Sequence, residues 1–346
     1  MNIGQLVIET ITNEGLMGAI ASSVIIILLG FYLRKKGTLN ETAAKTLSAV
    51  LLSAAIPALA FSAFMQDINP ETLRQGANVL IWGILVYILL IAVTKLMYAK
   101  YTGDKQDVLR VLTIFGSTTF FGIPIISAIY GAEGAMLAAI FNIGYRIFLY
   151  SYGYIKMSGL KIERKNIKTM FLNPIVLATF LGLFIWLIQG YLPQIAVGET
   201  TVGFLRVDQT IPWLYRPVIF LSNLASPLAW LSIGATLAEI SLEDAAKEKD
   251  AWYYTFMKIA IVPFINLVIL IILSITGIMP ISFVALATMI IMMATPTATV
   301  AAAYAIGFDK EAILTSNCSL VSTIVGVAAM PLWIVILEII NALNIF

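Results

Sequence analysis

Residues 115–124 read FGSTTFFGIP, which places two glycines, three hydroxyl residues and a proline inside an otherwise apolar stretch. A proline removes one backbone donor and clashes with the preceding helical turn, while glycine lowers the cost of leaving helical geometry. The stretch therefore predicts a helix that is interrupted midway. A simple proline kink, which membrane helices tolerate, is the alternative interpretation.

A second stretch, ATPTAT at residues 294–299, lies in the second half of the chain. Thr295 followed by Pro296 fits the N-cap and the first residue of a new half-helix. Two interrupted helices in corresponding halves of a membrane chain are the best sequence indication of a transporter binding site. The pair therefore favours interruption over a kink in both places.

Composition places both stretches in a membrane. The 346 residues are 60% hydrophobic and 12% charged, with a mean hydropathy of +0.95. Soluble domains carry about 25% charged residues, and an apolar chain in lipid satisfies its own backbone by forming helices. We therefore predict an all-α integral membrane protein with ten spans at residues 15–33, 45–65, 76–99, 107–131, 134–156, 173–190, 212–240, 252–276, 282–306 and 312–340.

Composition also excludes several functions. The chain has no histidine and one cysteine, Cys318, so zinc sites built on histidine, histidine-dependent catalysis and an intrachain disulfide are ruled out. The net charge of +2 gives no indication of nucleic-acid binding. We expect no enzyme activity, no catalytic residue, no metal site and no cofactor; the coupling ion, if there is one, is sodium or a proton.

The basic residues predict the orientation. Seventeen of the 21 lysines and arginines lie in or next to the odd-numbered loops, with Lys258 counted just inside the span 252–276. By the positive-inside rule these loops are cytoplasmic, so both termini face outside the cell membrane. The outer region 191–211 reads as an extra loop with a short interfacial helix.

The order of the spans predicts two repeats. A cytoplasmic linker at 157–172 divides the chain into five helices at 1–156 and five at 173–346. Because five is odd, the second set enters the membrane in the opposite sense, which is the condition for an inverted repeat. Weak internal support comes from three pairs at similar separations, namely Pro57 with Pro227, Pro124 with Pro296, and Asn142 with Asn317.

The predicted geometry suits an anion. The second half of the fourth helix and that of the ninth would both begin near the bilayer centre, so two helix N-termini would face one another there. Each N-terminus carries about +0.5 elementary charge and free N–H groups. The hydroxyls of the two stretches would add hydrogen bonds; they belong to Ser117, Thr118, Thr295, Thr297 and Thr299.

Arg146 adds a positive charge in the fifth helix, far from both membrane surfaces. A buried charge of this kind costs about 2.5–3.5 kcal/mol even on the lenient insertion scale, so it needs a partner. A substrate carboxylate and the carbonyls of a broken helix are the two candidates. Asn142 lies four residues earlier on the same helix face, and Asn317 in the tenth helix would pair with it or line the site.

These arguments give one set of candidate substrate-binding residues: Gly116, Ser117, Thr118, Gly122, Pro124, Asn142, Arg146, Thr295, Pro296, Thr297, Thr299 and Asn317.

The motifs resemble those of the auxin efflux carrier family, within the bile acid, arsenite and riboflavin transporter superfamily. The resemblance rests on residues 116–124 followed by Tyr130-Gly131, on Asn173-Pro174, on 226–235 and on 295–305. The short cytoplasmic loop looks like that of prokaryotic members.

The resemblance implies a fold of two inverted five-helix repeats. Helices 1, 2, 6 and 7 would form a scaffold, helices 3–5 and 8–10 a transport part, and the crossing of helices 4 and 9 the binding site. It further implies alternating-access transport of an organic anion, such as malate, malonate or an auxin-like acid, and a homodimer in the lipid bilayer. Asparagines common in the family's fourth-helix motif are replaced here by Ser117 and Phe120.

Three other functions compete with this interpretation. A sodium-coupled symporter of the bile acid type would bind sodium through unwound carbonyls and hydroxyls. A membrane sensor or an assembly subunit with a transporter fold is the second. A membrane enzyme is the third, although the sequence has neither a metal-ligand cluster nor paired carboxylates within its spans.

Overall fold

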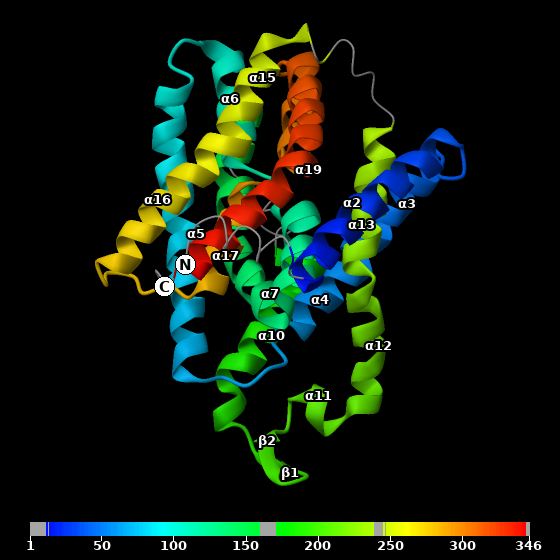
Figure 1. Ribbon diagram of the computed structural model, residues 1–346, viewed down its shortest axis with the longest axis vertical. Coiled ribbons are helices and arrows are strands. Elements are labelled where there is room, and N and C mark those ends of the chain that lie inside the picture. The colour runs from blue at the N-terminus through cyan, green and yellow to red at the C-terminus, as the bar shows by residue number, and fades with distance from the viewer. Residues whose placement is uncertain (1–11, 13, 160–170, 239–244, 246, 344–346) are drawn as a thin grey trace.

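The computed structural model describes residues 12, 14–159, 171–238, 245 and 247–343, which are almost entirely helical (Figure 1). Eight of its helices are long and apolar enough to cross a membrane, and one shorter apolar helix, α17, accompanies them. The all-α membrane fold is thus confirmed. The count of ten spans stays a prediction, because the interrupted helices are divided into short pieces. Most of the predicted linker at 157–172 lies outside the described residues.

The first half of the chain forms a series of helices that ends at Ser158. Their bounds are α2 (Glu14–Lys35), α3 (Glu41–Val50), η1 (Leu51–Ala55), α4 (Ile56–Ser62), α5 (Pro70–Met97), α6 (Gly103–Ile114), η2 (Thr118–Gly122), α7 (Ile123–Phe148), η3 (Leu149–Gly153) and α8 (Tyr154–Ser158). Helix α7 bends at Gly131, whose φ of 60° is not helical. The chain between α6 and η2 leaves the helix, as the first motif predicted.

The second half is also mostly helical and contains a short β-hairpin. Its elements are α10 (Pro174–Ile188), η4 (Gln189–Tyr191), β1 (Gln194–Val197), β2 (Thr200–Gly203), α11 (Val207–Thr210), α12 (Pro212–Asn223), α13 (Ala225–Leu237), α15 (Lys249–Phe256), η5 (Met257–Ile261), α16 (Val262–Ile275), α17 (Phe283–Met293), α18 (Thr299–Gly307) and α19 (Ala312–Ala342). The antiparallel hairpin β1–β2 was not predicted. A short helix within residues 191–211 was predicted, and α11 takes that place.

Prolines set the local irregularities of the helices. Three of the π-helical turns, η1, η2 and η5, are followed two residues later by Pro57, Pro124 and Pro263. A proline cannot donate to the carbonyl four residues before it and its ring clashes with that carbonyl, so the preceding turn widens. These wide turns change the direction in which neighbouring side chains leave the helix.

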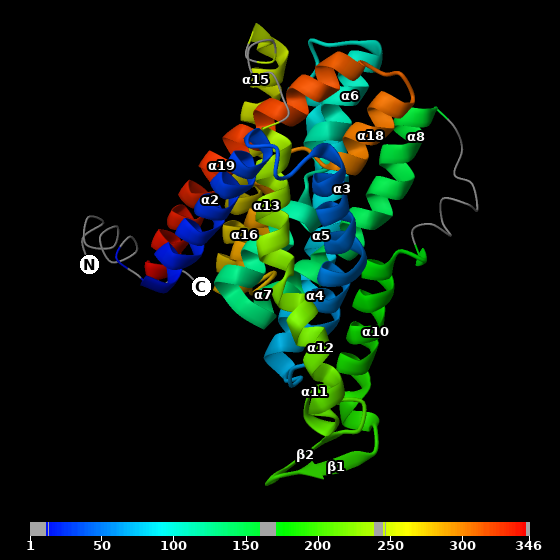
Figure 2. The same ribbon diagram turned by 90° about the vertical axis from the view of Figure 1, so that its right-hand side faces the viewer.

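Close packing of backbones joins the two halves. Helix α2 runs along α13, as Figure 2 shows. A Cβ atom at Gly234 would overlap the carbonyl oxygen of Ile27, and one at Gly30 would overlap that of Leu231. Small residues that let two backbones approach in this way are the common device of helix association in lipid.

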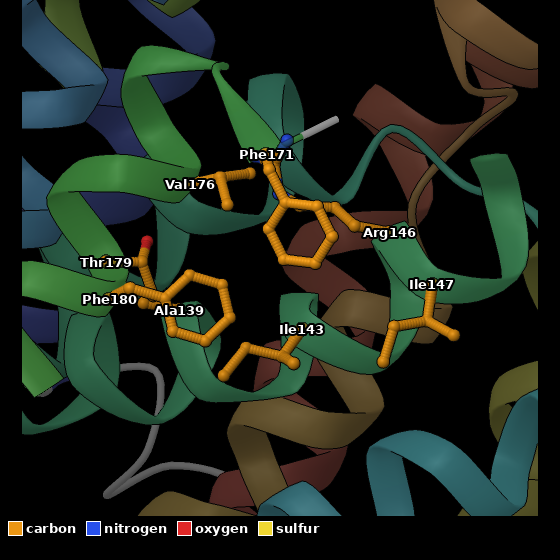
Figure 3. A pocket seen from close by; sticks show the side chains of 8 residues that line it. All are labelled: Ala139, Ile143, Arg146, Ile147, Phe171, Val176, Thr179 and Phe180. Carbon is orange, nitrogen blue, oxygen red and sulfur yellow. The ribbon is translucent and has the colours of Figure 1, made fainter. Parts of the chain in front are cut away.

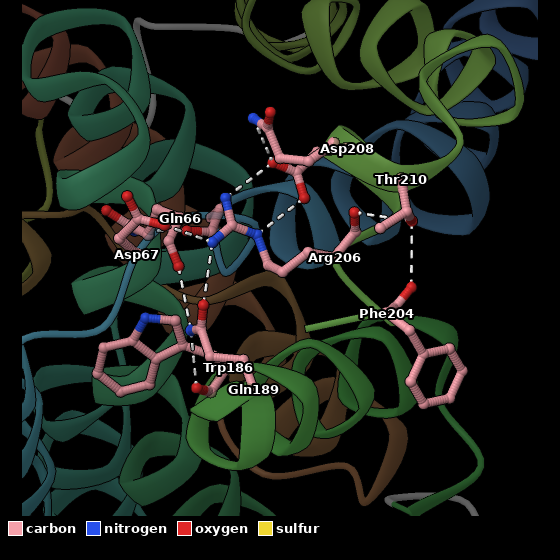
Figure 4. A network of polar contacts seen from close by, with 10 residues as sticks. Gln66, Asp67, Trp186, Gln189, Phe204, Arg206, Asp208 and Thr210 are labelled. Carbon is pink, nitrogen blue, oxygen red and sulfur yellow. Dashed lines mark hydrogen bonds and ion pairs between the residues drawn. The ribbon is translucent and has the colours of Figure 1, made fainter. Parts of the chain in front are cut away.

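The loop between α10 and α12 is fastened by Arg206, whose side chain is only 4% exposed (Figure 4). Its guanidinium donates to Asp208 at 2.9 Å, to Asp67 at 2.7 Å and to Gln189 at 2.9 Å. The hydrogen bonds to Asp208 raise the pKa of Arg206 despite its burial, and Asp67 adds to this effect. One side chain therefore ties the ends of α4 and α10 to the start of α11.

We expect Arg206→Ala to destabilise the protein by about 2 kcal/mol, because the buried side-chain carbonyl oxygen of Gln189 would lose its donor and the half-buried Asp208 would keep only the Gln209 amide. The thermal midpoint of the purified protein measures this effect. Arg216→Ala is the matched control, since Arg216 is exposed on α12. Equal midpoints for the two variants would show that the Arg206 contacts do not hold the loop.

Candidate functional site

The two interrupted helices meet at their breaks. Gly116 and Thr297 form an isolated antiparallel β-bridge. The Ser117 N–H donates to the Pro296 carbonyl at 2.7 Å, and the Ala298 N–H donates to the Phe115 carbonyl at 3.1 Å. Each break thereby supplies backbone partners that lipid cannot offer. The predicted crossing of the interrupted helices is confirmed.

Gly116 makes this close approach possible. A Cβ atom there would overlap the Thr295 hydroxyl and would lie 2.9 Å from Lys258 Nζ. The Thr295 hydroxyl is itself fixed, because it donates to the Met292 carbonyl at 2.8 Å. Only glycine therefore fits between the two breaks without displacing one of them.

Neighbouring helices hold the start of each half-helix. On the first side, the Thr118 hydroxyl donates to Asn142 Oδ1 at 2.7 Å, and Asn142 Nδ2 donates to the Thr119 hydroxyl at 3.3 Å. On the second side, the Ser322 and Thr297 hydroxyls are hydrogen-bonded at 2.9 Å. The hydroxyls of Tyr254 and Thr297 are also hydrogen-bonded, at 2.6 Å.

A cavity of about 370 Å³ opens on one side of the crossing. Its volume falls in the range of about 300–1,000 Å³ that small-molecule sites occupy. It is lined by five of the predicted residues, which are Ser117, Arg146, Pro296, Thr297 and Thr299. Other polar residues also line it, namely Ser48, Thr119, Tyr145, Tyr150, Asn173, Thr236 and Thr323.

Backbone donors accompany these side chains. Thr119 and Phe120 belong to the first turn of η2, and Thr299 and Val300 begin α18. Within the part of the chain that the structure describes, none of their four N–H groups has a hydrogen-bond partner. All four residues line the cavity. The two helix N-termini thus meet at one cavity, and the first turns of a helix carry free donors and partial positive charge.

The other seven predicted residues lie outside the cavity lining. Gly116, Thr118, Asn142 and Thr295 build the crossing itself. Gly122 packs against Met292, where a Cβ atom would come within 2.8 Å of the sulfur. Pro124 follows the wide turn η2, and its carbonyl accepts from the Ser226 hydroxyl at 2.8 Å. Asn317 on α19 is half-buried and does not pair with Asn142.

One detail of the second break was wrong. Thr295 was expected to cap a helix that begins at Pro296, but α18 begins at Thr299 with Ala298 at the N-cap. The backbone of 296–298 is instead engaged in the bridge to 115–117, which holds it extended. A tertiary contact therefore moves the helix start by three residues.

Arg146 lies between two spaces. It lines the polar cavity and also an apolar pocket of about 80 Å³ between α7 and α10. Figure 3 shows this pocket, whose other lining residues are Ala139, Ile143, Ile147, Phe171, Val176, Thr179 and Phe180. The guanidinium of Arg146 has neither an ion pair nor a hydrogen bond with any residue that the structure describes. Two partners were predicted for Arg146, a substrate carboxylate and the carbonyls of a broken helix. Within the described residues, no helix carbonyl accepts a hydrogen bond from it.

Lys258 is a residue that the sequence interpretation missed. It was counted with the cytoplasmic charges as lying just inside the span 252–276, but its side chain is fully buried beside the crossing, and its Nζ donates to the Thr113 carbonyl at 3.0 Å. The available signal was Pro263, five residues later, which predicts an irregular turn at this point.

Comparison with known proteins agrees with this architecture. The sequence pattern of the family described as "Membrane transport protein" matches residues 16–166 and 158–334. The chain belongs to this family. It is the auxin efflux carrier family that the motifs predicted.

Two relatives of this membrane transport protein come from methanogenic archaea. An uncharacterized transporter of Methanothermobacter thermautotrophicus is 27% identical over 326 residues, covering 92% of this chain and 97% of its own. An uncharacterized transporter of Methanocaldococcus jannaschii is 24% identical over 238 residues, covering 66% of this chain and 70% of its own. Family and relatives point to transport rather than catalysis.

We expect Gly116→Ala to separate the two breaks and to destabilise this transport protein by about 1–3 kcal/mol, the usual cost of overpacking. Thermal unfolding in detergent measures the change. Gly18→Ala is the control, because a Cβ atom at that helical position meets nothing within 4 Å. A Gly116→Ala variant as stable as the control would mean that the crossing tolerates a methyl group.

Proposed function

We propose that the protein is a secondary transporter or facilitator that binds a small organic anion at the crossing of its interrupted helices. The observation that carries this proposal is that Arg146 and four residues whose backbone N–H groups have no partner in the described part of the chain line one cavity. Groups of this kind favour a negatively charged ligand. An arginine with no hydrogen-bond or ion-pair partner among the described residues supplies the opposite charge that a carboxylate requires.

The lining residues support a substrate with one carboxylate. Among the described residues that line the cavity, Arg146 is the sole charged one. A dicarboxylate would leave one charge without a cation in a region of low dielectric, which is costly. The apolar pocket that shares Arg146 supports an apolar group on the same substrate. An auxin-like acid is therefore favoured over malate or malonate.

The cavity also supports alternating access. Its walls come from a first group of elements, α3, η1, α10 and α13, and from a second group, the crossing, α7, η3 and α19. Motion of the crossing against the first group would expose the cavity to each membrane face in turn. We further propose that the protein lies in the cell membrane with both termini outside, and that it forms a homodimer through its scaffold helices.

A thermal-shift screen of the purified protein tests the substrate class. Ligand binding to the native state raises the thermal midpoint in proportion to ln(1 + [L]/Kd). We expect monocarboxylates with an aromatic or branched group to raise it most, dicarboxylates less, and the corresponding neutral amides not at all. Equal shifts for acids and amides would refute an anion site.

Arg146→Gln tests the charge directly. A hydrogen bond to a charged group contributes about 1.5–3 kcal/mol, so we expect the Kd of a monocarboxylate to rise about 10- to 100-fold. Titration calorimetry measures this, and Arg146→Lys, which keeps the charge but loses the planar fork, should lose less. Unchanged affinity in Arg146→Gln would remove this residue from the site, and a lower thermal midpoint alone would assign it a structural role.

A further inference from the structure

Lys258 lies next to the crossing but does not line the anion cavity. Its side chain is 0% exposed, and its Nζ donates one hydrogen bond, to the Thr113 carbonyl. Lys258 takes part in none of the ion pairs found among the described residues. A buried ammonium without a carboxylate is costly, so its retention at this point calls for a reason.

The helix around Lys258 is shaped to bury it. Pro263 cannot donate to the Ile259 carbonyl four residues earlier, and the π turn η5 (Met257–Ile261) forms there. The freed Ile259 carbonyl accepts from the Trp333 indole at 2.8 Å. A hydrogen bond from α19 thus stabilises the wide turn that carries Lys258, independently of the ammonium itself.

The group that Lys258 meets is the C-terminal end of an interrupted helix. Thr113 belongs to the last turn of α6 (Gly103–Ile114), whose carbonyls lack partners within the helix. The Tyr254 hydroxyl donates to the Leu112 carbonyl at 3.1 Å, and Lys258 donates to that of Thr113. Such an end carries about −0.5 elementary charge, and in transporters with interrupted helices these carbonyls coordinate the coupling cation.

We propose that the Lys258 ammonium is the resident cation of the crossing, so that the anion site forms without sodium. The inference rests on the proposed function, because it concerns how the same crossing is held. A tethered cation does not dissociate, and the α6 carbonyls keep their partner whichever salt surrounds the protein. Lys258 is a positioning residue in this scheme, and a sodium gradient does not drive transport.

The first test uses the unaltered full-length protein in detergent without any organic anion. Its thermal midpoint is measured in sodium, lithium, potassium and N-methylglucamine chloride at equal ionic strength. We expect one midpoint in all four salts. A midpoint that rises with sodium concentration, and with no other cation, would overturn the proposal, because it would reveal a sodium site in the native state.

The second test removes the cation. Lys258→Ala leaves the Thr113 carbonyl without its donor and opens a space of matching length. We expect ethylammonium or butylammonium chloride to raise the midpoint of this variant by about 5 °C or more near saturation, and that of the unaltered protein by none. Lys249→Ala, on the same helix segment but exposed, is the control and should not respond.

A Lys258→Ala variant that no alkylammonium or alkali cation stabilises would overturn the proposal, since Lys258 would then merely fill space. If this variant does not fold, Lys258→Met replaces it, with the salt series as its readout. In this variant the α6 carbonyls have lost their tethered cation, so a thermal midpoint that rises with sodium supports the proposal. A midpoint that is the same in all four salts opposes it. Neither test involves the organic anion, so failure here is distinguishable from failure of the anion site, which the Arg146 variants report.

Discussion

The structure depends on two helix breaks that satisfy each other's backbone. In lipid a broken helix leaves N–H and C=O groups that water cannot reach, and each unpaired group costs several kcal/mol. The hydrogen bonds from Ser117 to Pro296 and from Ala298 to Phe115 remove part of this cost for both breaks at once. Because each break needs the other, the two halves of the chain must cross at this point. Gly116 is the residue that lets them approach.

The same arrangement separates charge across the crossing. The half-helices that begin there, at Thr118 and Thr299, direct positive ends and free N–H groups toward one cavity. Two half-helices end there, α6 and α17, and the last turn of α6 presents the Thr113 carbonyl to the ammonium of Lys258, which lies outside the cavity lining. An anion on one side and a cation on the other are what this polarity favours. The chemistry of the site thus follows from where the helices stop and not from acidic or catalytic side chains.

The sequence was sufficient wherever the cause of a feature is local. Glycine and proline in residues 115–124 and 294–299 predicted both breaks, and apolar length predicted the membrane helices. Features set by tertiary contacts were missed. The start of α18 moved to Thr299 because the bridge holds residues 296–298 extended. Asn142 was considered as a partner of Asn317, but its side chain pairs with Thr118 and Thr119 in its own half of the chain. Lys258 was placed just inside the span 252–276 but counted with the cytoplasmic charges, because its burial beside the crossing depends on the turn before Pro263 that Trp333 supports.

The most direct test of the account is the position of a bound anion. The brominated analogue of the monocarboxylate with the largest thermal shift is suited to this, since anomalous scattering locates bromine without reference to the protein. The account predicts density in the cavity between Ser117, Thr297 and Arg146, with the carboxylate toward the guanidinium. Density at another place on the protein, with this cavity empty at saturating ligand, would contradict it.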